Sequence, residues 1–199
     1  MNAALAATAA TAATILYWTI AAGAAGRRQT TIGTFPPLLP IVVAASAGAA
    51  ALGGVHASAI AATAGAAVAG VVDARTGSIF DPLTAAVLFA SLALSALDGS
   101  LADGLTGAAC VGGALLFLHA LSGGRGLGLG DVKLGAGLGM ALGFSAGVAA
   151  IALAFVFGGA YGTWLLASKR ASAGASIRFG PFMAAGTFVA LLVPLGCRA

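Results

Sequence analysis

Residues 148–166 read VAAIALAFVFGGAYGTWLL, an apolar run that contains no charged residue. A helix of roughly 17 to 25 apolar residues crosses the hydrocarbon core of a bilayer, so this run is long enough to span one. Similar apolar runs precede and follow it along the chain. A soluble protein of this length has too little interior to bury six or more such segments on every side. The sequence therefore predicts an integral membrane protein built from helices.

The overall composition agrees with a membrane protein. Of the 199 residues, 60% are hydrophobic and 7% are charged, and the mean hydropathy is +1.07, whereas about a quarter of the residues in a soluble domain are charged. The net charge of +4 comes from nine basic residues scattered in ones and twos, so we expect no nucleic-acid partner and a lipid bilayer as the surroundings. Cys110 and Cys197 lie in apolar runs and are expected to be packing residues, and the sequence predicts no metal and no cofactor.

The apolar runs predict an all-α polytopic domain over residues 1–199 with eight transmembrane helices. Residues 1–36 would form the first helix and a short basic cytoplasmic loop, and residues 37–199 the core. Residues 37–72 read either as one long helix or as a hairpin turned at Gly53, Gly54 and His56. With the hairpin, the helices are expected at about 3–25, 37–53, 57–73, 82–97, 104–121, 131–145, 147–168 and 180–196.

The basic residues favour the hairpin. With eight helices and the amino end outside, all the basic residues except Arg198 fall at cytoplasmic ends, as the positive-inside rule requires. The same arrangement places Asp73 and Asp131 on the cytoplasmic side, and Asp98 and Asp103 in an outer loop.

Asp73 and Asp131 are the residues most suited to chemistry. Asp73 ends the apolar run AATAGAAVAGVVD, and Asp131 begins a helix within GLGLGDVKLGAGLGM. Ionisable residues at membrane depth are usually functional. Two carboxyl groups that lie close together share a proton, so one can accept a proton from water while the other donates to a scissile carbonyl. The glycines before Asp131 allow another segment to approach the backbone closely. This pattern favours aspartic proteolysis.

Three separated motifs give the chain a resemblance to a known family. Residues 128–134, GLGDVKL, resemble the GxGDxKL motif of the type IV prepilin peptidases. Residues 71–84, VVDARTGSIFDPLT, are similar to that family's segment around its first aspartate. Residues 177–182, IRFGPF, resemble the PFGPF run at the start of its last helix. The resemblance extends over most of the chain.

The resemblance implies an aspartic endopeptidase of the bacterial plasma membrane. It would cut the short basic leader of membrane-inserted prepilin or pseudopilin-like substrates on the cytoplasmic side, after a Gly. Asp73 and Asp131 would be the catalytic pair, with Gly128, Gly130 and Lys133 as the supporting motif residues. The loop GRRQTTIGTFPP at residues 26–37 lacks the paired cysteines of the family's methylation domain. We therefore expect a short form with peptidase activity and no dedicated methylation module.

Departures from the family pattern and plainer roles remain open. Phe80 stands where the family often has Pro, and Arg178 replaces the first Pro of the PFGPF run. Arg75, Asp81 and His119 are expected near the pair. Each of these residues also has a plainer possible role. Asp131 would be the N-cap of its helix, Asp73 would pair with Arg75 at the interface, and Asp81 would cap the helix that begins at Pro82. His119 would make an interfacial hydrogen bond, and Lys133 would bind lipid headgroups.

Two other protein classes compete with this interpretation. The presenilin and signal-peptide-peptidase group also uses GxGD, but its YD and PAL motifs are absent from this sequence. A non-enzymatic membrane protein, either a small transporter or a scaffold for pilus or secretion assembly, would use the aspartates to bind a proton or an ion. Inverted repeats with broken helices would favour a transporter, and the sequence contains no convincing repeat.

Overall fold

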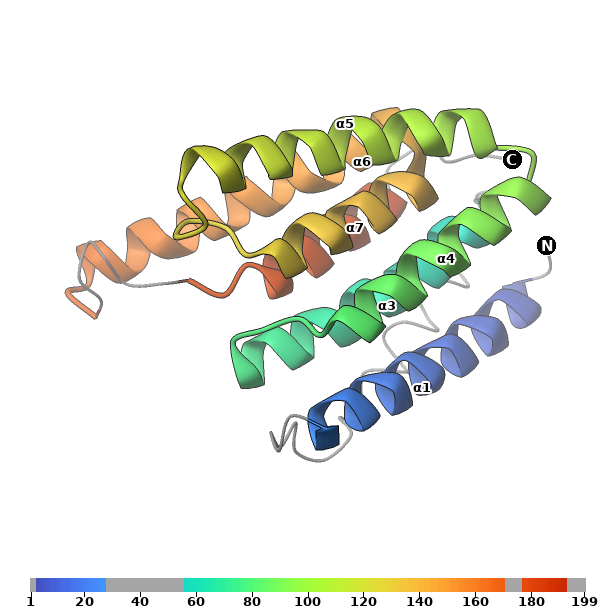
Figure 1. Cartoon of the computed structure of the whole chain (residues 1–199), viewed down its shortest axis with the longest axis horizontal. Coiled ribbons are helices and arrows are strands. Elements are labelled where there is room, and N and C mark those ends of the chain that lie inside the picture. The colour runs from blue at the N-terminus through green and yellow to red at the C-terminus, as the bar shows by residue number, and fades with distance from the viewer. Residues whose placement is uncertain (1–2, 28–55, 171–176, 193–199) are drawn as a thin grey trace.

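The computed structural model describes residues 3–27, 56–170 and 177–192, and the described residues contain no β-strand (Figure 1). Four helices are long and apolar enough to span a membrane, and two are apolar but shorter. The chain is thus an all-α integral membrane protein. The helices are α1 (Ala3–Arg27), α3 (Ala57–Thr76), α4 (Asp81–Leu97), α5 (Leu101–Leu121), α6 (Leu129–Ala167) and α7 (Gly180–Leu192).

Most of the predicted helices are found within three residues of their predicted bounds. The expected helices 3–25, 57–73, 82–97 and 104–121 correspond to α1, α3, α4 and α5, and α7 begins at Gly180 as expected. The expected helix 37–53 and the turn residues Gly53 and Gly54 lie outside the described residues. The count of eight transmembrane helices and the external amino end therefore stay predictions.

The long helix α6 doubles back on itself at Gly143, whose φ of 76° and ψ of −176° are not helical. A Cβ atom added to Gly147 would lie 3.1 Å from the Cα atom of Gly139, whereas residues eight apart in a continuous helix are about 12 Å apart. Residues 129–142 and 144–167 therefore form two antiparallel halves (Figure 1). Two helices were predicted here, but the predicted boundary at residue 146 was wrong by three residues, because Gly143 is the residue that adopts the positive φ.

Side chains from α3 and α4 satisfy the backbone groups exposed by this break. The last carbonyls of a helix have no partner within it. The Ser95 hydroxyl donates to the Met140 carbonyl at 3.0 Å, and the Ser58 hydroxyl donates to the Ala141 carbonyl at 3.1 Å. The backbone N–H of Ser58, in the first turn of α3, donates to the Asp98 carboxylate at 3.0 Å. These polar residues therefore stabilise helix ends.

Helix α3 occupies the centre of the fold, where it contacts α1, α4, α6 and α7. Its many Ala and Gly residues make these close contacts possible. A Cβ atom added to Gly65 would lie 3.3 Å from the Tyr17 ring of α1, and one added to Gly70 would lie 3.2 Å from the Cα atom of Pro181 in α7. Small side chains on α3 thus bring α1 and α7 close to the helix that carries Asp73.

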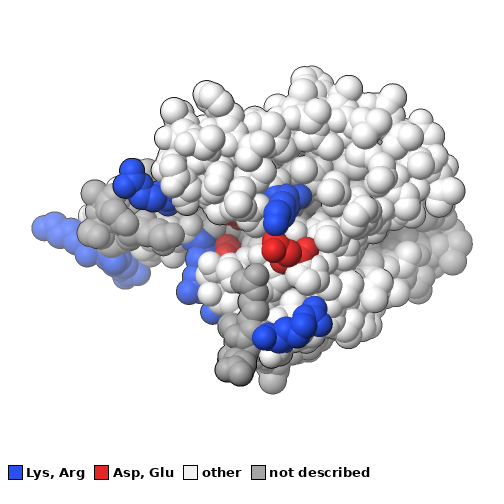
Figure 2. Space-filling model, in the orientation of Figure 1, with Lys and Arg blue, Asp and Glu red and all other residues white. Residues whose placement is uncertain are grey.

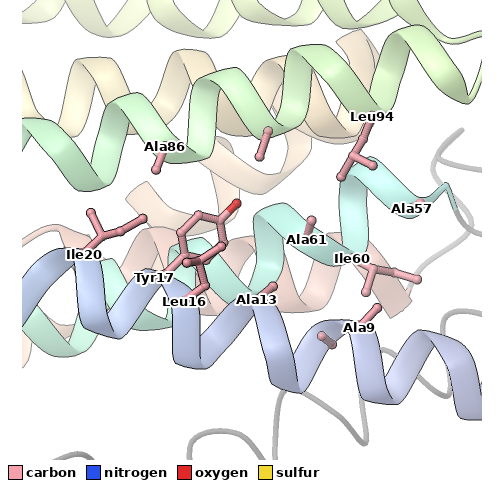
Figure 3. A pocket seen from close by; sticks show the side chains of 12 residues that line it. Ala9, Ala13, Leu16, Tyr17, Ile20, Ala57, Ile60, Ala61, Ala86 and Leu94 are labelled. Carbon is pink, nitrogen blue, oxygen red and sulfur yellow. The ribbon is translucent and has the colours of Figure 1, made fainter.

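Helix α1 covers one side of α3 and α4 and leaves space between them. An apolar cavity of about 310 Å³ lies among the three helices. Leu16 and Tyr17 of α1, Ile60 of α3 and Leu94 of α4 are among the residues that line it (Figure 3). In the close-up view the labelled side chains that line the cavity are aliphatic, apart from Tyr17 with its ring and hydroxyl group. It is therefore an incompletely filled contact within the bundle, separate from the two aspartates.

Candidate active site

Asp73 and Asp131 lie at adjoining helix ends. Asp73 is in the last turn of α3, which ends because Gly77 adopts a φ of 72° and donates its N–H to the Asp73 carbonyl at 2.8 Å. Asp131 is in the first turn of α6. A Cβ atom added to Gly130 would lie 3.1 Å from the carbonyl oxygen of Ile79. The segment that follows α3 therefore packs directly against the start of α6, and Gly130 permits this close approach.

The Asp73 side chain is buried, with 6% of its surface exposed. Its Oδ2 atom accepts a hydrogen bond of 2.9 Å from the backbone N–H of Gly180, the first residue of α7. The free N–H groups and the dipole at the start of a helix stabilise a carboxylate placed there. A Cβ atom added to Gly180 would lie 2.8 Å from the Cβ atom of Asp73. Glycine thus lets the start of α7 reach the carboxylate.

The Asp131 side chain is half-buried and also lies at a helix start. Its Oδ2 atom accepts a hydrogen bond of 3.2 Å from the backbone N–H of Gly128. The N-cap role predicted for Asp131 is therefore wrong, because Gly128 is the N-cap residue and Asp131 lies three residues further on, where its carboxylate accepts the N-cap N–H. The Asp73 carboxyl group is also close enough to Asp131 to interact with it electrostatically. The hydrogen bond from Gly128 and the pairing of the two acids are compatible.

The basic side chains of the described residues concentrate around this end of the bundle. In Figure 2 the acidic side chains lie near the centre of the face, with basic side chains above them, below them and to their left, and no charged side chain is seen on the right-hand part. The described basic residues all lie at or next to helix ends on the side of the two aspartates. They are Arg27, Arg75, Arg125, Lys133, Lys169, Arg170 and Arg178.

Lys133 and Asp81 form an ion pair beside the aspartates, with 2.7 Å between the Lys133 Nζ and Asp81 Oδ1 atoms. Asp81 is the first residue of α4, and Phe80 is its N-cap. The prediction that Asp81 caps this helix was therefore wrong, because the helix begins one residue earlier than expected. Its carboxylate instead links the start of α4 to the start of α6.

We expect loss of this ion pair to change the free energy of unfolding by less than about 1 kcal/mol, because both side chains are half-exposed or more and water screens their attraction. Asp81→Asn, Lys133→Gln and the double variant, unfolded in mixed detergent micelles, give the coupling energy of the pair. A coupling energy well above this value would mean that the pair holds α4 and α6 together.

Arg75 and His119, which were predicted near the pair, contact neighbouring elements. The Arg75 guanidinium lies 5.7 Å from the ring centroid of Trp18 in α1. The Nδ1 atom of His119, near the end of α5, is 2.6 Å from the carbonyl oxygen of Leu127. His119 therefore ties α5 to the loop that leads into the GLGD segment, as the interfacial hydrogen bond predicted for it would.

The start of α7 contributes groups that were not predicted as site residues. Besides the Gly180 N–H group, the Arg178 guanidinium donates to the carbonyl of Ala74. The IRFGPF run was recognised in the sequence as a motif, but a backbone N–H has no side-chain signal, and its partner is 107 residues away in the chain. Among the described residues, no three His, Cys, Asp or Glu side chains come together as a metal site would require.

Comparison with known proteins gives one match. A model of the type IV leader peptidase family matches residues 60–163, which is just over half of the chain. The matched segment includes Asp73, Asp131 and the whole GLGDVKL run, and it ends before α7. No curated protein and no solved structure is significantly similar to the chain.

Proposed function

The chain belongs to the type IV leader peptidase family, and we propose that it is an aspartic endopeptidase whose catalytic pair is Asp73 and Asp131. Membership of the family makes it a protease of the leader peptidase type. The observation that supports the aspartic mechanism is the placement of the two carboxyl groups at adjoining ends of α3 and α6, close enough to interact. Each also accepts a backbone N–H at a helix start, which limits the orientations that it can adopt.

In the proposed reaction, the two carboxyl groups share one proton and act on opposite sides of the scissile peptide bond. The ionised carboxylate takes a proton from a water molecule as that water attacks the carbonyl carbon. The protonated carboxyl group gives its proton to the carbonyl oxygen, so a neutral tetrahedral intermediate forms. When the intermediate breaks down, the carbon–nitrogen bond is cleaved and the protonated carboxyl group gives its proton to the leaving amine. The other carboxylate takes a proton from one hydroxyl of the intermediate, which becomes the new carboxyl group, so the pair again holds one proton.

We propose that the substrates are membrane-inserted prepilins or pseudopilin-like proteins, cut at the cytoplasmic face of a bacterial plasma membrane. The family supports this substrate class. The basic residues at the helix ends on the side of the aspartates support the cytoplasmic face, because cytoplasmic ends of transmembrane helices are enriched in Lys and Arg. Asp131 is partly exposed at this end, so water has access to the pair.

Cleavage of a prepilin-type substrate in membranes containing the purified protein tests this proposal. We expect a single cut after the leader Gly, identified by the mass of the new amino terminus, and that mass should carry no added methyl group. A substrate whose leader Gly is replaced by Val serves as the control and should stay intact. If several prepilin-type substrates remain uncut by the folded protein, the transporter or scaffold interpretation is preferred.

A further inference from the structure

Residues 177–182 form a short run that lies between α3 and the second half of α6. Two aromatic side chains of this run contact α6. The ring of Phe179 lies 4.8 Å from that of Phe155, and the ring of Phe182 lies 5.5 Å from that of Tyr161, measured between centroids. These contacts fix the run against the second half of α6, which carries neither aspartate.

The groups between those aromatic side chains contact α3. The Arg178 guanidinium donates to the Ala74 carbonyl, and the Gly180 N–H donates to the Asp73 carboxylate at 2.9 Å. Residues 177–182 therefore present alternate groups to the two sides, aromatic rings to α6 and hydrogen-bond donors to α3. Because the first N–H groups of a helix have no partner within it, the Gly180 N–H is available to the carboxylate.

Close packing leaves the start of α7 little freedom against α3. A Cβ atom added to Gly70 would lie 3.2 Å from the Gly180 carbonyl oxygen, and one added to Gly180 would lie 3.0 Å from the Asp73 Oδ2 atom. The positive charge of Arg178 also lies near enough to interact with the Asp73 carboxylate. A shift of residues 178–180 would therefore move or release the Asp73 side chain.

We propose that Arg178 and Gly180 are positioning residues of the peptidase. The Gly180 N–H holds the Asp73 carboxylate in one orientation, and Arg178 fixes the last turn of α3, from which Asp73 projects. The proposal rests on the proposed catalytic role of Asp73. Misplacing a reacting group by about 1 Å can cost roughly 100-fold in rate, so the positioning contact should affect the chemical step more than the binding of substrate.

Kinetics of Arg178 variants test the positioning role. Arg178→Gln should lower kcat by roughly 10- to 100-fold with little change in KM, and Arg178→Lys should recover part of the loss because it keeps the charge and a donor. The matched control is Arg170→Gln. The Arg170 guanidinium lies 4.9 Å from the centroid of the Trp164 ring, so this variant should behave as wild type. The proposal would be overturned if Arg178→Gln changed KM alone. It would also be overturned if Arg178→Gln lowered kcat no more than Arg170→Gln does.

A measurement without substrate separates this proposal from the proposed function. In protein labelled with ¹³C at the Asp carboxyl carbons, the resonance missing from Asp73→Asn identifies Asp73. Arg178→Gln and Gly180→Ala should both move that resonance, and Arg170→Gln should leave it in place. An unmoved Asp73 resonance in both site variants contradicts the positioning contact. A wild-type protein that cuts no substrate but responds in this way would contradict only the proposed function.

Discussion

Asp73→Asn and Asp131→Asn should each reduce cleavage of a prepilin-type substrate by roughly 10⁴-fold, the scale of loss when one member of a catalytic unit is removed. An amide has nearly the shape of a carboxyl group but neither accepts nor releases a proton at neutral pH. The amide oxygen of Asn can still accept the Gly180 N–H at residue 73 and the Gly128 N–H at residue 131. The substitutions should therefore remove proton transfer and leave the fold intact.

The measurement is single-turnover cleavage by each variant, with the product identified by mass. Asp98→Asn is the matched control, because Asp98 also accepts a backbone N–H at a helix start, that of Ser58, but at the opposite end of the bundle. It should cleave at nearly the wild-type rate. Substantial cleavage by either site variant would exclude that residue from the pair, and equal loss in the control would trace the effect to folding.

Gly143→Ala should lower the free energy of unfolding by about 2 to 4 kcal/mol. The backbone of Gly143, with φ 76° and ψ −176°, lies in a region that is essentially restricted to glycine and costs other residues about 1 to 3 kcal/mol. An added Cβ atom would also collide with the Asp103 carboxylate. That carboxylate accepts the Phe144 N–H at 3.2 Å and so caps the second half of α6, a contact worth about 1 kcal/mol.

Reversible unfolding in mixed detergent micelles measures this effect. Gly159→Ala is the control, because Gly159 lies within the second half of α6 and an added Cβ atom there would meet nothing within 4 Å. In a helix interior, Ala is more stable than Gly by about 0.5 to 1 kcal/mol, so the control should be unchanged or slightly more stable. If Gly143→Ala were as stable as this control, the reversal of α6 would not depend on the glycine conformation.

The sequence also predicted that Arg75, Asp81 and His119 lie near the two aspartates, and this stays a prediction. Lys133 and Asp81 contact one another, and neither the Arg75 contact with Trp18 nor the His119 contact with Leu127 involves an acidic side chain. All four residues lie at or near helix ends on the side of the two aspartates. Which groups these side chains contact depends on how each helix is rotated against its neighbours, and the sequence alone does not show that rotation.

The sequence by itself determined that the chain is helical and membrane-embedded, and it singled out Asp73 and Asp131, because apolar length and an isolated charge are properties of a short stretch of chain. Only the tertiary structure decided that α6 reverses at Gly143 and that the Asp73 carboxylate accepts the Gly180 N–H from 107 residues away. These features depend on how closely small residues let helices approach, and on which backbone groups a helix end leaves unpaired. Neither can be read from hydropathy along the chain.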